Sequence, residues 1–217
     1  MISLKIDKIK STIPKEVTLV AVSKTKPASM IEKGMKNGHL DFGENKVQEL
    51  VEKHEKLPKS IRWHMIGHLQ RNKVKYIAPF VHLIHGVDSE RLLNEINKQG
   101  KKNNRIINCL LQFHIAEEST KFGFNIEEIQ EIIDANKISE WQNINIRGVM
   151  GMATFTDDIS QIKKEFKQLQ SNYHLLCEQL SKSTFNVLSM GMSGDYNTAI
   201  ECGSNMIRIG SSIFGSR

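Results

Sequence analysis

Residues 18–27 read TLVAVSKTKP, an apolar run that ends in two lysines and a proline. Valine and leucine are typical of buried β-strands, in which successive side chains point to opposite faces. One face of the expected strand is therefore shared by Thr18, Val20, Val22 and Lys24. If that face is the interior of a closed sheet, the strand ends with the Lys24 side chain at the mouth of the interior.

Seven more short apolar runs follow, separated by longer segments whose apolar residues recur at three- and four-residue spacing. Such spacing predicts helices with one face on a core, so strands and helices alternate. Eight such units in 217 residues predict an α/β fold, a single (β/α)8 TIM barrel domain over residues 1–217. A doubly wound open sheet is the alternative, although it seldom needs eight strands. The expected strands cover residues 17–23, 40–45, 61–67, 81–87, 106–114, 144–152, 186–191 and 205–210.

The composition indicates which partners and which cellular compartment to expect. The 30 Lys and Arg residues are interleaved with 24 Asp and Glu, and aromatic residues make up only 6%, so we expect no nucleic acid partner. Three cysteines at unrelated spacings predict free thiols in a reducing cytoplasm. We expect no membrane partner, because no apolar stretch is long enough to span a bilayer. Residues 2–12 predict an extra N-terminal helix that covers the bottom of the barrel.

Two loops at the expected barrel mouth are rich in glycine and serine. The seventh strand runs into GMSGD (191–195) and the eighth into GSSIFG (210–215). Barrel active sites lie at the carboxyl ends of the strands, and the loops after strands seven and eight often bind phosphate. Glycine and serine expose backbone N–H groups and hydroxyls to an anion, although either loop alone fits a simple turn equally well. Their joint position favours an anion site.

Lys24 is expected beside these loops, because closing a barrel makes the first strand a neighbour of the last. A partly desolvated lysine near other cations is nucleophilic and condenses with an aldehyde. A ligand that carries both an aldehyde and a phosphate is pyridoxal 5′-phosphate (PLP), which the arrangement predicts as the cofactor. The alternative is a lysine that extends to solvent from the end of a strand.

Arg208 is expected to point into the barrel, opposite Ile207 and Ile209 on the same strand. A buried guanidinium needs an acceptor, because an unpaired buried charge is costly. Glu44 is one candidate acceptor, and the pyridine nitrogen of the cofactor is the other. Arginine does not readily release a proton, so a ring bound in this way stays a weak electron sink.

Seven motifs follow one another along the chain: AVSKTKP (21–27), FGENKVQE (42–49), WHMIGHLQRNK (63–73), STKFG (119–123), RGVMGM (147–152), SMGMSGDYNTAI (189–200) and GSNMIRIGSSIFG (203–215). Together they resemble the YggS/PROSC family of PLP homeostasis proteins. The resemblance implies a lone barrel similar to the N-terminal domain of bacterial alanine racemase, with PLP held as a Schiff base by Lys24. It also implies a non-catalytic protein that takes part in intracellular vitamin B6 homeostasis.

The resemblance implies roles for individual residues as well. Ser193, Gly210 and Ser211 would hold the phosphate, and Arg208 would face the pyridine nitrogen. The pocket would be lined further by Asn45, His64 and Met150. The expected partners of this cytoplasmic monomer are PLP itself and PLP-dependent apo-enzymes or vitamin B6 enzymes.

His68 is a departure from the family pattern, which often has proline at this position. The conformation of the loop that carries His68 therefore does not follow from the family pattern. His68 also creates a histidine pair with His64. Gly67 at a strand end breaks the helical geometry that such a zinc pair needs, so we expect no metal. The remaining histidines lack ligand spacing and are interpreted as ordinary residues: His39, His54, His82, His85, His114 and His174.

Two enzyme classes remain as alternatives. A PLP-dependent amino-acid racemase needs a second acid or base on the opposite face of the cofactor. In alanine racemase that group comes from a second domain and the partner subunit, whereas the tyrosines here lie within helices or begin one. A Schiff-base aldolase would share Lys24 and the anion loops but would bind no chromophore.

Overall fold

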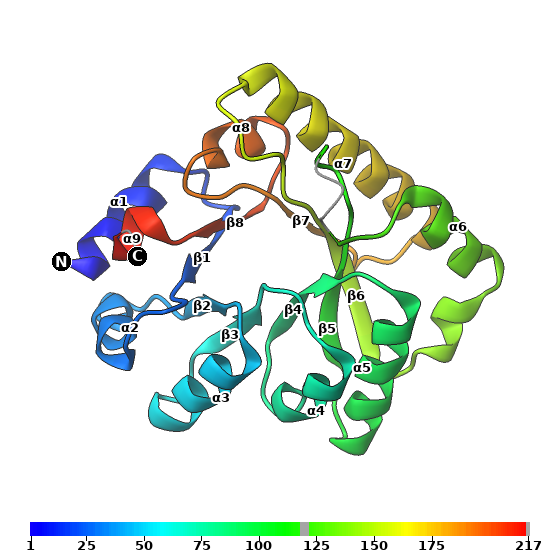
Figure 1. Cartoon of the computed structure of the whole chain (residues 1–217), viewed down its shortest axis with the longest axis horizontal. Helices are drawn as coiled ribbons and strands as arrows, with labels where there is room; N and C mark the ends of the chain where they lie inside the picture. The colour runs from blue at the N-terminus through cyan, green and yellow to red at the C-terminus, as the bar shows by residue number, and fades with distance from the viewer. Residues whose placement is uncertain (118–121, 216–217) are drawn as a thin grey trace.

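A computed structural model describes residues 1–117 and 122–215. Over these residues eight parallel strands pair in sequence order, and the last pairs with the first to close a barrel (Figure 1). Each strand lies within the run expected from the sequence, so the predicted TIM barrel is confirmed. The strands are β1 (Thr18–Val22), β2 (Asp41–Glu44), β3 (Arg62–Met65), β4 (Leu83–Val87), β5 (Ile107–Gln112), β6 (Ile144–Met150), β7 (Val187–Ser189) and β8 (Met206–Ile209).

Helices surround the barrel (Figure 1). Their apolar faces pack on it, as in α5, where Leu92, Leu93 and Ile96 are buried. None of the described helices is long and apolar enough to cross a membrane. In the part of the chain that the structure describes, the α-helices are α1 (Ile2–Thr12), α2 (Ala28–Met35), α3 (Val47–Lys56), α4 (Val74–Ile77), α5 (Glu90–Lys102), α6 (Ile126–Asp134), α7 (Ile159–Leu180), α8 (Tyr196–Glu201) and α9 (Ser211–Phe214), with 3-10 turns at Arg71–Lys73 and Lys137–Glu140.

The N-terminal helix α1 forms over the expected residues but not in the expected place. It lies at the periphery of the barrel and packs against α2 and α9 (Figure 1). Because α9 has only one turn after the last strand, α1 supplies buried side chains, among them Ile6 and Ile9, in this part of the outer layer. The segment after α1, with Ile13 and Pro14, reaches the amino ends of the strands.

Side chains alternate between two layers of the barrel, as the sequence predicts. Leu19 and Ile207 belong to the large core between the strands and the helices. In the β1–β8 register Val20 pairs with Arg208, and Lys24 follows just beyond the carboxyl end of β1. A separate apolar cluster fills the barrel interior and consists of Val20, Leu83, Leu110, Met150, Val187 and Met206.

Candidate functional site

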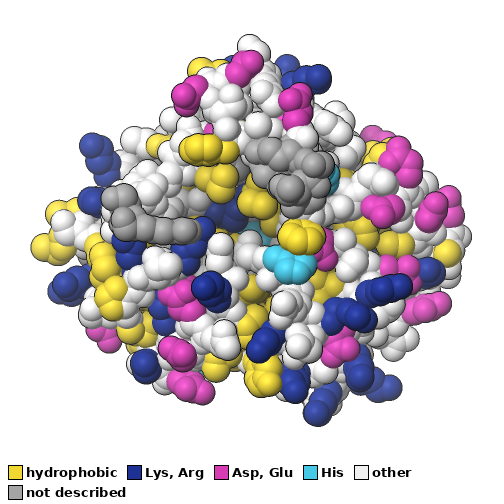
Figure 2. All heavy atoms as spheres, viewed as in Figure 1, with side chains coloured by type: hydrophobic (Ala, Val, Ile, Leu, Met, Phe, Trp, Pro, Cys, Tyr) yellow, Lys and Arg dark blue, Asp and Glu magenta, His cyan; other side chains and the backbone are white. Residues whose placement is uncertain are grey.

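A cavity of about 810 Å³, called here the upper cavity, opens at the carboxyl ends of the strands. Figure 2 shows a hollow near the centre of the visible face, with hydrophobic, basic and histidine side chains at its edge. The closed barrel brings to this cavity residues from four distant parts of the chain. Six of the eight predicted site residues line it: Lys24, Asn45, Ser193, Arg208, Gly210 and Ser211.

Lys24 lies half-buried in the loop that follows β1. The next residue, Thr25, has a left-handed backbone with φ of 65°, which costs a non-glycine residue on the order of 1 kcal/mol. The Thr25 N–H donates to Glu49 Oε1 on α3 over 2.6 Å. This bond to α3 holds the strained turn and so fixes the backbone from which Lys24 extends.

The loops after β7 and β8 meet at the upper cavity. The Gly210 N–H donates to Ser193 Oγ over 3.3 Å, so polar groups of both loops face the same space. Gly191 starts the first loop with φ of 99°, and a side chain there would collide with α8, so only glycine fits. The Asp195 carboxylate accepts from the Met192 N–H over 2.5 Å, which directs it toward the backbone of its own loop.

Arg208 is buried, 4% exposed, at the inner end of the upper cavity. Its Nη1 donates to Ser189 Oγ over 2.6 Å, and its Nη2 donates to the Gly151 carbonyl over 3.0 Å. Burial lowers the pKa of the guanidinium to about 10, so the group stays charged at neutral pH. Glu44, one of the two candidate acceptors for Arg208, instead accepts from Lys53 Nζ over 2.7 Å.

Two predicted pocket residues do not line the upper cavity. Met150 is fully buried in the apolar interior of the barrel. His64 is also buried and lines a second cavity of about 830 Å³, called here the lower cavity, at the amino ends of the strands. The resemblance implied that both residues line the PLP pocket, but their motifs carry no information about which end of the barrel each side chain faces.

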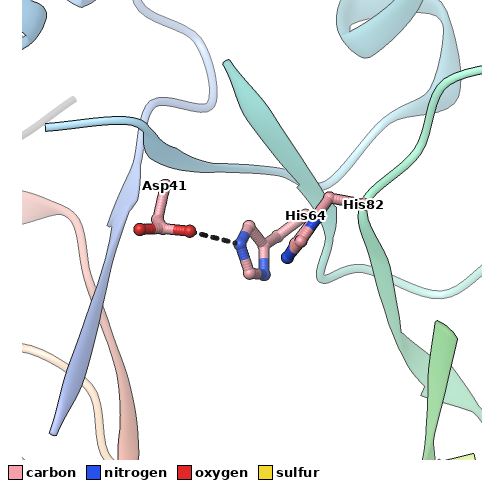
Figure 3. Close-up of side chains that lie close together, drawn as sticks. All are labelled: Asp41, His64 and His82. Atoms are coloured by element: carbon pink, nitrogen blue, oxygen red, sulfur yellow. Dashed lines mark hydrogen bonds and ion pairs between the residues drawn. The ribbon is translucent and has the colours of Figure 1, made fainter. Parts of the chain in front are cut away.

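The lower cavity brings Asp41, His64 and His82 together (Figure 3). Their potential metal-ligating atoms lie within 4.8 Å of one another, and His64 Nε2 is 3.2 Å from Asp41 Oδ1. His82 and His85, interpreted from the sequence as ordinary residues without ligand spacing, both contact His64. Their spacing along the chain gives no signal, because the cluster forms only when neighbouring parallel strands pair.

The charges around this cluster favour hydrogen bonding over cation binding. Arg62 donates from Nε to Asp41 Oδ1 over 2.7 Å and from Nη2 to Oδ2, so both carboxylate oxygens are engaged. Burial, together with the charges of Arg62 and Arg147, lowers the pKa of His82 to about 4. A metal ion bound here would compete with Arg62 for Asp41 and face this positive potential. We therefore treat the cluster as part of a hydrogen-bond network.

His68, the departure from the family pattern, lies at the other end of the barrel from the lower cavity. It lines the upper cavity, where its Nδ1 is 2.9 Å from Asp88 Oδ2 and its ring stacks on Phe122 with centroids 4.3 Å apart. His68 thus ties the loop after β3 to the loop after β4. His64 and His68 line different cavities and do not form a pair.

The buried His39 beside the lower cavity predicts a measurable loss of stability in acid. Burial, aided by the charge of Lys10, lowers its pKa from 6.5 to about 4. The unfolded chain binds a proton that the folded state excludes, so stability is lost as the pH falls from 6.5 toward 4. Between pH 7 and about pH 5 the wild type should lose about 2 kcal/mol more than His39→Gln, measured by urea unfolding. Equal losses would contradict the assignment.

Comparisons with known proteins agree with this architecture. The chain matches the family model "Alanine racemase, N-terminal domain" over residues 2–217. PipY from Synechococcus elongatus with PLP bound has a TM-score of 0.91 and 30% identity, covering 99% of this chain and 100% of that one. An alanine racemase from Bartonella henselae with covalently bound pyridoxal phosphate has a TM-score of 0.76 at 14% identity, covering 99% of this chain and 58% of that one, which shows a shared fold. The protein is thus a barrel of the alanine racemase N-terminal type.

A narrower relationship follows from sequence identity. A Pyridoxal phosphate homeostasis protein of Pasteurella multocida is 36% identical over 204 residues, which cover 93% of this chain and 87% of that protein. The chain therefore belongs to the family of pyridoxal phosphate homeostasis proteins. The resemblance inferred from the seven motifs is confirmed.

Proposed function

We propose that this protein is a non-catalytic carrier that holds PLP as a Schiff base on Lys24 and takes part in intracellular PLP homeostasis. Residues 1–217 act in this proposal as one PLP-binding barrel domain. One observation carries it: Lys24, Arg208 and the loops with Ser193 and Ser211 line the same cavity. The names of the relatives and the PLP bound to PipY support the same cofactor.

The groups in the upper cavity fit those of PLP. When bound, PLP supplies an aldehyde that condenses with an amine, an anionic phosphate and a pyridine nitrogen. Lys24 provides the amine, and the hydroxyl of Ser193 with the backbone of Gly210 and Ser211 provides donors for the phosphate. Arg208 has five N–H donors and uses Nη1 and Nη2 for the bonds described above, so further N–H groups are left for the pyridine nitrogen.

The same groups argue against PLP chemistry that passes through a fully delocalised carbanion. Arg208 keeps its proton at neutral pH, so the ring beside it stays a weak electron sink. Racemisation also needs a second acid or base of matched pKa on the face of the cofactor opposite Lys24. The described residues that line the upper cavity include no tyrosine to fill that role.

We expect the protein saturated with PLP to convert L-alanine to D-alanine far more slowly than about 1 s⁻¹, the low end of typical enzyme rates. Chiral chromatography of the products, with an alanine racemase assayed in parallel, measures the rate. Turnover at or above that value would establish the racemase alternative in place of the carrier.

An absorbance scan followed by chemical trapping tests the proposal directly. The purified protein with PLP should show the visible band of a lysine Schiff base, and borohydride reduction should fix the adduct on the peptide that contains Lys24. An adduct on Lys26, or on Lys121, which lies outside the described residues, would refute the assignment. A protein that binds no PLP but is trapped with a sugar-phosphate substrate would instead be the aldolase.

The proposed partners are PLP-dependent apo-enzymes or vitamin B6 enzymes, and the proposed state is a cytoplasmic monomer. Phe155, 97% exposed, and Phe122, 56% exposed, form part of an apolar rim around the upper cavity. Exposed apolar side chains that border a ligand cavity are a common feature of protein interaction sites. This rim supports delivery of PLP by contact with an acceptor.

A further inference from the structure

A row of polar side chains from five strands connects the two cavities through the barrel interior. Arg208 Nη1 lies 2.6 Å from Ser189 Oγ, and Ser189 Oγ lies 3.2 Å from His85 Nδ1. His85 Nε2 lies 2.9 Å from His64 Nδ1, and His64 Nε2 lies 3.2 Å from Asp41 Oδ1. We propose that these five residues form a directional hydrogen-bond relay through which Asp41, in the lower cavity, orients Arg208 in the cofactor site.

If His64 and His85 each carry a single ring proton, one arrangement of protons satisfies every link. Arg208 donates to Ser189 Oγ, and the Ser189 hydroxyl donates to His85 Nδ1. His85 then donates from Nε2 to His64 Nδ1, and His64 donates from Nε2 to the Asp41 carboxylate. The opposite direction fails at its last link, because an unprotonated His64 Nε2 would face an ionised carboxylate with no proton between them. The relay therefore runs from a cation to an anion.

The charges of Asp41 and Arg208, the two ends of the relay, support this direction. Burial alone would raise the pKa of Asp41, but hydrogen bonds from Arg62 and His64 outweigh it and hold the pKa well below its usual range. Asp41 thus remains a carboxylate and accepts. At the other end Arg208 remains charged and donates.

The middle of the relay is sealed from solvent. Ser189 and His85 are fully buried and His64 is 1% exposed. Burial, aided by the nearby charge of Arg208, lowers the pKa of His85 well below its usual value, so this imidazole is neutral. Aligned hydrogen bonds strengthen one another in a medium of low dielectric constant. Asp41 and Arg208 therefore influence each other along a path that excludes water.

The consequence for PLP rests on the proposed function. Ser189 and Gly151 hold two nitrogens of the guanidinium, and the relay fixes the hydrogen-bonding state of Ser189. His64, His85 and Ser189 are then positioning residues, which set the orientation and the effective charge of Arg208 without touching the cofactor. Weakening the far end of the relay should change the environment of the pyridine nitrogen.

Nitrogen NMR of histidine in the wild-type protein without PLP tests the relay itself. Two-bond proton–nitrogen spectra distinguish the two neutral tautomers and the doubly protonated ring. We expect His64 and His85 both to carry their single proton on Nε2 at neutral pH. A proton on His85 Nδ1, or a doubly protonated His64, would overturn the proposed direction. This result does not depend on whether PLP binds.

The link to the cofactor is tested with Asp41→Asn and a matched control, Glu16→Gln. Both remove one negative charge from the wall of the lower cavity, but Glu16 is not part of the relay. Asp41→Asn should shift the visible band of bound PLP and weaken PLP binding about fivefold, the low end of typical coupling between sites, while Glu16→Gln does neither. Equal behaviour of the two variants would overturn the coupling. A wild-type protein without a PLP band would refute the proposed function and leave the NMR result to judge the relay.

Discussion

Lys24→Ala is expected to abolish the visible band of bound PLP, and Lys26→Ala is expected to retain it. Both lysines are half-buried and line the upper cavity, but only Lys24 continues the inward face of β1. The left-handed Thr25 and the bond from the Lys26 N–H to the Ser23 carbonyl, 3.1 Å, turn the chain between them. The alternation of side chains between the two faces of β1 therefore ends at Lys24.

The two variants should be compared at equal PLP concentration by absorbance and by mass spectrometry after borohydride reduction. Circular dichroism of each variant checks that the barrel remains folded. An undiminished band in Lys24→Ala would show that another lysine carries the aldehyde. Loss of the band in both variants, with both folded, would show that the cavity as a whole and not Lys24 alone determines binding.

Lys53→Met is expected to destabilise the protein by about 3–5 kcal/mol, the loss typical when one partner of a buried ion pair is removed. Lys53 Nζ donates to the Ser23 carbonyl over 2.8 Å and to Glu44 and Glu49, each over 2.7 Å. Glu44 is fully buried, and among the described residues its Oε2 has no hydrogen-bond partner. Removing the ammonium leaves this carboxylate uncompensated directly below the loop of Lys24.

Urea unfolding at several pH values measures this loss. Lys56→Met, on the exposed side of the same helix, should change stability by less than about 0.5 kcal/mol. Burial raises the pKa of Glu44 to about 7 despite the bond from Lys53. Without the Lys53 ammonium the pKa of Glu44 should rise further, so the loss in Lys53→Met should be largest in alkaline solution and shrink as the pH falls to about 7, where Glu44 of the variant binds a proton. A loss independent of pH would mean that packing, and not the buried charge, is responsible.

The fold and the core of the site could be predicted from sequence because both follow from local rules. Apolar runs alternating with helical spacing specified the barrel, and strand parity placed Lys24 and Arg208 inside it. The two loops proposed to bind phosphate were found from their composition and from their position after the last two strands. The signal for each strand, helix or loop lies within a short stretch of chain, and the barrel follows from their order along the sequence.

The features that could not be predicted depend on contacts between segments that are far apart in the sequence. The partner of Glu44 is Lys53 on the following helix and not Arg208, because a helix that returns over its own strand brings that side chain closer. The cluster around His64 forms across strands whose pairing register fixes which side chains meet. The position of α1 depends on the shortness of α9, which no pattern within residues 2–12 reveals.

The polar row inside the barrel also bears on how the strands find their alignment. Hydrophobic side chains tolerate many neighbours, so an apolar interior alone discriminates poorly between strand pairings that differ by one residue. A slip of β4 by one position would turn His85 outward among the helices and leave Ser189 and His64 without their buried partners. A barrel with a shifted strand would therefore be less stable than the native one. The residues that join the two cavities would thus favour the correct strand register during folding.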